Sequence, residues 1–154
     1  MRDRKIISMM FALFLSSILI VGCTVSSNMS LTFNVETGDA IEIELDTSDG
    51  LKLKEVDGHF AVVDGDQKVL EGSFLTEQMY EGWKGMKDEE GVAVLEEFEK
   101  DGNPCFMLEV NKDGRILDFI VMWIDGSDTA VVVQGYLEPE MTKNVFDMLA
   151  FSKE

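Results

Sequence analysis

Six Asp-Gly dipeptides divide most of the chain into short apolar segments, and this punctuation constrains the fold more than any other feature. The dipeptides are Asp49-Gly50, Asp57-Gly58, Asp64-Gly65, Asp101-Gly102, Asp113-Gly114 and Asp125-Gly126. Pairs of this kind supply the positive backbone φ angles that tight β-hairpins require. The spacing therefore predicts antiparallel strands that follow one another along the chain and are joined by short turns.

The segments between these turns have the periodicity of strands. Residues 31–35 and 41–45 alternate apolar and polar side chains, which predicts two half-buried strands. Residues 116–124 form a nearly continuous apolar run, which is typical of a central strand covered on both faces. Besides residues 31–35 and 41–45, the expected strands cover residues 51–56, 60–63, 68–75, 92–99, 105–110, 115–124 and 129–137.

Two segments have helical spacing instead. Residues 76–86 place aromatic residues and methionines at helical intervals behind Thr76, which is a suitable cap. Residues 139–151 begin with a proline suited to a first helical turn and carry the apolar stripe Met141, Val145, Met148 and Leu149. The predicted fold class is therefore α+β, with an antiparallel meander of about six strands and the C-terminal helix packed on one face.

The order of these elements resembles a known family. Trp123-Ile124-Asp125-Gly126-Ser127 stands before Thr129-Ala130-Val131-Val132-Val133, after a strand pair and a Gly-rich helical segment. Residues 40–151 are in this respect similar to the PsbP-type α/β/α sandwich of small bacterial lipoproteins of unassigned function. The resemblance rests on element order. It implies a non-enzymatic binding or assembly role, and it carries no family site residues onto this chain.

The N-terminus has the features of an export signal. Arg2, Arg4 and Lys5 precede an uncharged run over residues 6–21, and Gly22 then precedes Cys23. This arrangement resembles the bacterial lipoprotein signal with its lipobox, in which the cysteine thiol receives diacylglycerol before cleavage. The alternative is an uncleaved membrane helix, but the run is shorter than the roughly 18–20 residues that a span needs.

The lipoprotein interpretation divides the chain into three parts. Residues 1–22 are the signal peptide, residues 23–30 are the lipidated Cys23 with a flexible tether, and residues 31–154 are a single acidic domain. The expected location is the extracytoplasmic face of a cell membrane, with the lipid as the membrane contact.

The charge of the mature chain excludes some partners. Three of the 13 basic residues and one of the 30 acidic residues lie in the signal, which leaves 10 basic and 29 acidic side chains, a balance of −19. Nucleic acid and anionic lipid surfaces both require clustered cations, so neither is an expected partner. The acidity itself fits either simple solubility or an acidic recognition surface.

Few residues could support catalysis or hold a metal ion. Cys105 is expected to be a small buried hydrophobe, because its nearest charged neighbours in sequence are acidic and would not activate a thiol. His59 is the only histidine, and we interpret it as a partly exposed residue at a strand end. Residues 109–120 match an EF-hand loop in part, but Ile120 stands where the bidentate glutamate belongs, so a hairpin is the better interpretation. The sequence thus predicts no catalytic residue, metal ligand or cofactor.

The aromatic residues leave a binding role open. Trp123 lies within an apolar run and is expected in the core, whereas Tyr80 and Trp83 lie on a Gly-rich helical segment and are the predicted binding residues. The expected function is a non-catalytic binding or assembly module for a protein or envelope component. The alternatives are a small envelope glycan hydrolase using a carboxylate pair and a structural subunit of an envelope complex. An exposed aromatic ridge would favour binding, and two facing carboxylates in a concave pocket would favour hydrolysis.

Overall fold

A computed structural model describes residues 27–154, which form ten strands, two α-helices and one 3₁₀ turn. The helices are α2, Glu77–Gly85, and α3, Pro139–Asp147, and the 3₁₀ turn η1 is Met86–Asp88. The strands are β1 Asn28–Asn34, β2 Ala40–Asp46, β3 Lys52–Val56, β4 His59–Asp64, β5 Gln67–Leu75, β6 Val92–Lys100, β7 Asn103–Lys112, β8 Arg115–Trp123, β9 Ala130–Gly135 and β10 Leu149–Lys153.

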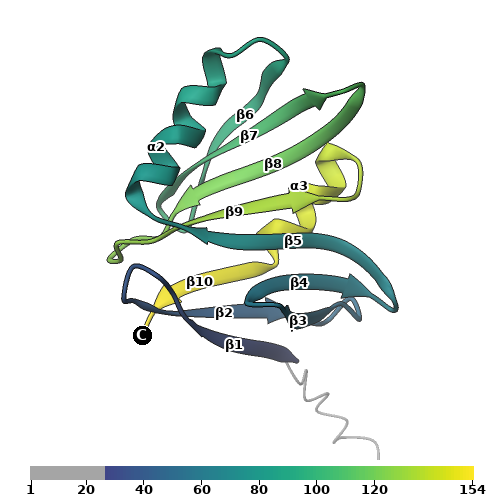
Figure 1. The fold of residues 1–154 in the computed structure, drawn as a ribbon. Helices are drawn as coiled ribbons and strands as arrows, with labels where there is room; N and C mark the ends of the chain where they lie inside the picture. Colours follow the sequence, from purple (N-terminus) through teal and green to yellow (C-terminus); the bar gives the residue numbers. More distant parts are fainter. Residues whose placement is uncertain (1–26) are drawn as a thin grey trace, which may run out of the picture.

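The strands form two antiparallel sheets (Figure 1). Seven strands pair in the order β3-β4-β5-β9-β8-β7-β6, and three pair in the order β1-β2-β10. The prediction of a mostly antiparallel domain with a C-terminal helix is therefore confirmed. The expected single meander of about six strands is replaced by two sheets, because β1 and β2 leave the larger sheet and pair with the end of the chain.

Three of the Asp-Gly dipeptides make the two-residue hairpin turns that the sequence predicts. At Asp57-Gly58, Asp101-Gly102 and Asp113-Gly114 both residues have positive φ, with values of 51° and 80°, 52° and 79°, and 54° and 78°. Positive φ at both central residues is the requirement of a type I′ turn, whose twist matches that of the flanking strands. These turns fix the registers of β3–β4, β6–β7 and β7–β8.

The helix predicted at the C-terminus is shorter than expected. It ends at Asp147, and Leu149 begins β10, which pairs with β2. The predicted apolar stripe from Met141 to Leu149 is wrong in two respects. Met141 is 53% exposed, and Leu149 is buried as part of strand β10 instead of the helix. The helix instead buries Thr142 and Phe146. Residues 149–151 are buried, exposed and half-buried in turn, which is consistent with the period of a strand.

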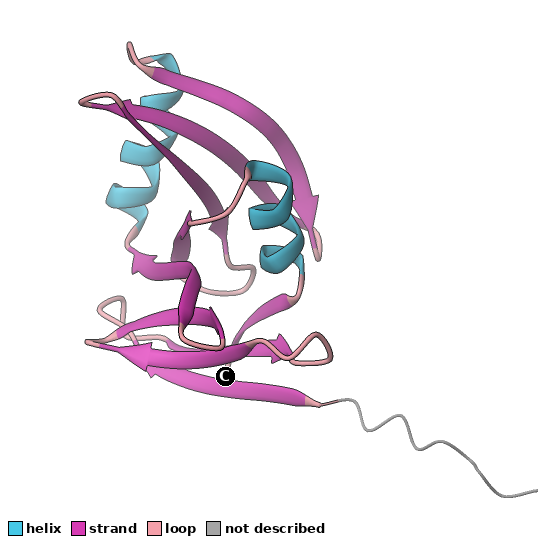
Figure 2. Cartoon of the chain, turned by 90° about the vertical axis from the view of Figure 1, so that its right-hand side faces the viewer, coloured by secondary structure: helices cyan, strands magenta, loops and turns pink. Residues whose placement is uncertain are grey.

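The helices cover opposite faces of the larger sheet (Figure 2). We call the face that carries Met107, Ile120 and Met122 the inner face, and it packs against α3 and the three-stranded sheet. The outer face carries Phe106, Leu108 and Val121, and α2 covers it with half-buried aromatic side chains. The predicted helix over residues 76–86 is confirmed with its cap, since the Thr76 hydroxyl accepts a hydrogen bond from the Met79 amide.

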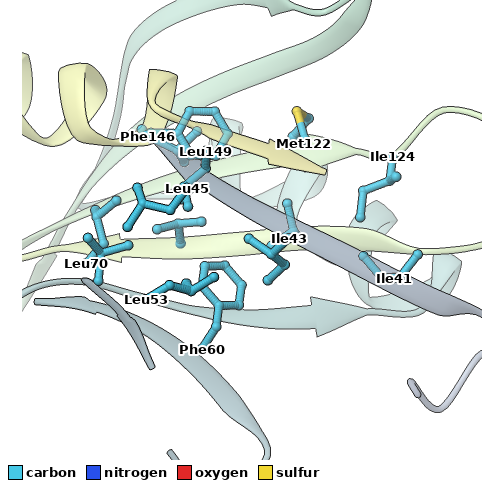
Figure 3. Close-up of a cluster of buried hydrophobic side chains, with 14 of the residues drawn as sticks. Ile41, Ile43, Leu45, Leu53, Phe60, Leu70, Met122, Ile124, Phe146 and Leu149 are labelled. Atoms are coloured by element: carbon cyan, nitrogen blue, oxygen red, sulfur yellow. The ribbon is translucent and has the colours of Figure 1, made fainter. Parts of the chain in front are cut away.

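The main core lies between the two sheets and α3. Alternate residues of β2 point into it and are fully buried, as the period of two along residues 41–45 predicts. Leu45 lies beside Phe146 of α3 and Leu149 of β10, and Ile41 lies towards Ile124 (Figure 3). Burial of this many aliphatic and aromatic side chains is the main stabilising contribution in a domain of this size.

A buried carboxylate joins the two sheets at one end. Asp39, in the β1–β2 turn, accepts hydrogen bonds from the Asp128 amide at 2.8 Å and from the Thr129 hydroxyl at 3.0 Å. Lys153 of β10 lies 2.6 Å from the same carboxylate. The hydrogen bond from Lys153 and those from the β8–β9 turn lower the pKa of Asp39. The turn of one sheet is thereby fastened to a turn of the other.

The first strand begins inside the predicted tether. β1 starts at Asn28, so residues 28–30 pair with β2 instead of forming a free linker. Cys23, the predicted lipidation site, lies outside the described residues. Within residues 27–154, no helix is long and apolar enough to cross a membrane.

Candidate functional site

An open pocket of about 770 Å³ lies where β9 ends and the chain turns into α3. The last pair between β8 and β9 joins Asp118 to Gly135, so residues 115–117 of β8 extend beyond the end of β9. The segment 136–139 then crosses towards the helix and leaves a hollow beside these residues, which pair with β7 but not with β9. Its volume is within the range of about 300–1,000 Å³ that is usual for ligand sites.

The start of α3 is held tightly against β9 beside this pocket. The Thr142 side chain lies directly on Gly135, where an added Cβ atom would come within 2.3 Å of it. Thr142 also donates a hydrogen bond to the Leu137 carbonyl at 3.1 Å. A glycine is needed at this position because any side chain would push the helix away from the sheet. The segment that forms this wall is therefore anchored by the contact between α3 and β9.

Three carboxylate side chains line the pocket, and they come from three different elements. Glu109 of β7 and Asp118 of β8 are directly paired neighbours on the inner face. Glu138 is the residue immediately before α3. Like charges placed opposite each other across two strands destabilise a sheet. This part of the fold therefore contains unfavourable electrostatics that a bound cation would relieve.

Asp118 is the most unusual of the three. Its side chain is nine-tenths buried, and no hydrogen bond from the described residues reaches its Oδ1 atom. Burial raises the pKa of this carboxyl group, and the nearby charges of Glu109 and Glu138 raise it further. Buried polar atoms without a partner cost roughly 1–3 kcal/mol each and cluster at functional sites. Asp118 is accordingly the strongest single indication of a site in the described domain.

The rest of the lining is apolar or neutral. Ile116 and Met141 are 61% and 53% exposed and form a hydrophobic rim. Tyr136 also lies at the rim, where its hydroxyl donates a hydrogen bond to Glu71 at 2.8 Å. Lysine, arginine and histidine are all missing from the residues that line this pocket. The pocket thus combines negative charge with apolar walls.

The predicted binding residues Tyr80 and Trp83 lie elsewhere, on α2. Their rings are half-buried against the outer face, with the Tyr80 ring centroid 5.2 Å from that of Trp123 and the Trp83 centroid 5.0 Å from that of Phe119. Both side chains therefore fasten the helix to the sheet. Binding through them stays a prediction, and the part of each ring that faces the sheet is already covered.

Two residues considered for catalysis are placed as the sequence predicts. Cys105 is buried, and burial raises the pKa of its thiol to about 11, which opposes thiolate chemistry. His59 is exposed at the start of β4, and its Nδ1 atom lies 2.8 Å from the Ser73 hydroxyl. The sequence did not predict this contact between His59 and Ser73. Glu71, the acid next to this pair along β5, is engaged by Lys68 at 2.8 Å, so it does not complete a triad.

The prediction that residues 109–120 form a hairpin and not an EF-hand loop is confirmed, since they form the β7–β8 hairpin with its turn at Asp113-Gly114. Among residues 27–154 there is no group of three or more His, Cys, Asp or Glu side chains placed to hold one metal ion. The three pocket carboxylates are spread along the wall and do not form such a group.

The sequence did not single out the pocket residues. Asp118 is the one charged residue inside the run from Ile116 to Ile124, and this isolation was the available signal. A lone acid in a strand covered on both faces must be buried, paired or functional. Glu109 is the partner of Asp118 in the hairpin that turns at Asp113-Gly114, whereas Glu138 becomes its neighbour only through the placement of α3.

Similarity to known proteins adds no residue to this set. Comparison of the chain with protein-family models, with curated proteins and with solved structures found no match.

Proposed function

We propose that this chain is a membrane-anchored extracytoplasmic lipoprotein that acts as a non-catalytic binding module for an envelope component, and that the acidic pocket is its binding site. The observation that carries the proposal is the buried Asp118 carboxylate without a partner in a concave pocket. An unpartnered buried polar group calls for an explanation, and a ligand that completes its hydrogen bonds provides one. The element order that resembles PsbP-type lipoproteins supports the same class of function.

Site-specific cross-linking tests the location of the binding site. A photoreactive residue at Met141, on the rim of the pocket, should capture a partner in intact membranes, and Asp118→Asn should abolish the adduct. Met79 is the matched control, because it is similarly exposed at 50% but lies on α2, on the opposite face of the sheet. Adducts formed from Met79 and not from Met141 would assign binding to the helix of Tyr80 and Trp83.

Lipid anchoring is tested separately at Cys23. The lipobox resemblance predicts that Cys23→Ala leaves an unprocessed precursor or moves the protein from the detergent phase to the aqueous phase. Cys105→Ala is the control, because this buried thiol has no part in the anchor. Normal processing and lipid labelling of the Cys23 variant would contradict the assignment.

A small glycan hydrolase is the second candidate, and the raised pKa of Asp118 beside Glu109 favours it. An acid with a raised pKa could protonate a leaving group while a second carboxylate assists. However, Glu109 and Asp118 project from one face of adjacent strands, so they approach a substrate from one side and do not flank a scissile bond. Release of reducing ends from envelope glycan that is abolished by both Glu109→Gln and Asp118→Asn would favour this candidate over binding.

A further inference from the structure

We propose that the acidic pocket receives a lysine or arginine side chain of a partner protein. This inference rests on the proposed binding function and names the chemistry of the partner. Three features of the described residues lead to it, namely the arrangement of negative charge, the apolar walls and the exposed rim.

The charge of the pocket fits a cation that lies close to Asp118. Glu109, Asp118 and Glu138 contribute three carboxylates, and the lining contains no basic side chain. At the rim, Lys68 lies over the Tyr136 ring at 5.5 Å and is held by Glu71 at 2.8 Å. Its charge is therefore already balanced by a carboxylate outside the pocket. An incoming ammonium or guanidinium group would give Asp118 the hydrogen-bond donor that it lacks.

The walls of the pocket fit the rest of such a side chain. Ile116, Leu117, Leu137 and Met141 line the hollow beside the carboxylates. Lysine and arginine carry aliphatic stems that bury against apolar surface while the charged head stays with polar groups. A small hydrated ion would leave these walls uncovered, whereas a long cationic side chain would contact both parts of the lining.

The rim favours a side chain on a protein over a free amine. Ile116, Tyr136 and Met141 are large apolar or aromatic residues that remain exposed around the opening. Such side chains gain most when a partner surface covers them together. The excess of acidic groups over basic ones in the chain would also speed the approach of a basic partner. We therefore place the cation on a protein surface with apolar residues next to it.

Binding of the cation changes the ionisation of the pocket. A positive charge next to Asp118 stabilises the carboxylate and opposes the effects of burial, Glu109 and Glu138. Protons bound in the empty pocket are then released on binding, and affinity rises with pH through the range in which Asp118 titrates. Tyr136, at the rim, has a pKa raised by burial and by Glu71 and stays neutral in this range.

The test measures peptide binding to the full chain, purified from membranes in non-ionic detergent, by fluorescence polarisation. The probe is a short labelled peptide with one lysine between leucines, and its analogue has norleucine in place of lysine. The lysine peptide should bind, the norleucine peptide should bind at least tenfold more weakly, and Asp118→Asn should weaken lysine binding about tenfold or more. Asp66→Asn removes one acidic charge from the exposed β4–β5 turn and should leave binding unchanged.

Each other result overturns the proposal in a recognisable way. Equal binding of the two peptides would show that the lysine head is not recognised. Equal weakening by Asp118→Asn and Asp66→Asn would show attraction to overall charge alone. If spermidine displaced the peptide and bound as tightly as the peptide does, the ligand would be a free polyamine instead of a protein. If the peptide fails but the Met141 cross-link still depends on Asp118, the binding function stands and the cationic chemistry is wrong.

Discussion

Replacing Asp118 by asparagine should stabilise the domain at neutral pH. The Asp118 carboxylate is buried, has an unpartnered oxygen and faces the charges of Glu109 and Glu138. The amide has nearly the same shape and carries no charge. Asp118→Asn therefore removes an unfavourable charge without leaving a cavity.

The size and the pH dependence of this effect follow from the same contacts. An unsatisfied buried polar group costs roughly 1–3 kcal/mol, and the amide still loses water, so the expected gain is about 1 kcal/mol at pH 7. The pKa of Asp118 is higher in the folded state than in the unfolded chain, where an aspartate titrates near 3.9. The folded state is therefore penalised progressively as pH rises from the unfolded pKa through the folded pKa. The gain from the variant should be present at pH 7 and should disappear below about pH 3.9.

Chemical unfolding at a series of pH values measures this difference directly. The variant should have a higher unfolding midpoint than the parent at pH 7, and the two curves should converge in acid at an unchanged slope. Asp66→Asn is the same chemical change in an exposed turn and should give overlapping curves at every pH. A variant that is less stable than the parent at pH 7 would mean that Asp118 already has a stabilising partner and would refute the description of the pocket.

Three further predictions test the core and the contact between the two sheets. Leu149→Ala removes a 1% exposed side chain from the main core and should lower the free energy of unfolding by about 2–5 kcal/mol, whereas Met141→Ala, on the exposed side of α3, should change it by less than about 0.5 kcal/mol. Gly72→Ala would place a Cβ atom 2.0 Å from the Phe60 ring, so a loss of about 1–3 kcal/mol is expected, and Phe60→Leu in the same chain should recover part of it. Asp39→Asn should destabilise the domain at pH 7, and because the pKa of Asp39 is lowered by Lys153, the difference from the parent should shrink as pH falls below the unfolded value.

Local chemistry made the hairpins predictable. Three Asp-Gly dipeptides take the positive φ angles that a two-residue turn requires, and few other residue pairs do so without strain. The alternation along residues 41–45 likewise matches the buried and half-exposed positions of β2. Each of these features depends only on residues close together in sequence, which is why the sequence could specify them.

The division into two sheets could not be predicted in the same way. Asp49-Gly50 resembles the other turns, yet it joins β2 of the small sheet to β3 of the large one. At Asp64-Gly65 the strands pair through Asp64 and Gln67, which moves the turn by one residue to Gly65 and Asp66. A dipeptide shows where the chain turns, but the next partner of a strand is decided by the faces that it must bury.

The end of the chain shows how tertiary contacts override a local pattern. Met148 and Leu149 continue the apolar spacing of the helix, so the sequence favours helix up to residue 151. In the fold β2 pairs with β1 on one side, and pairing with β10 satisfies its backbone groups on the other side while Leu149 still becomes buried. Burial of Leu149 was predictable from its type, and the secondary structure that buries it was not.

The pocket lies at the limit of what the sequence can reveal. A strand that is covered on both faces normally excludes charge, so Asp118 within its apolar run already implied an unusual environment. The neighbours that make this environment acidic come from β7 and from the start of α3, and their positions depend on one hairpin register and on the contact between Gly135 and Thr142. If Gly135 carried a side chain, α3 would move off the sheet and Glu138 would move with it. The site therefore depends on tertiary packing, and its main signal in the sequence is a carboxylate, Asp118, within the apolar run of a central strand.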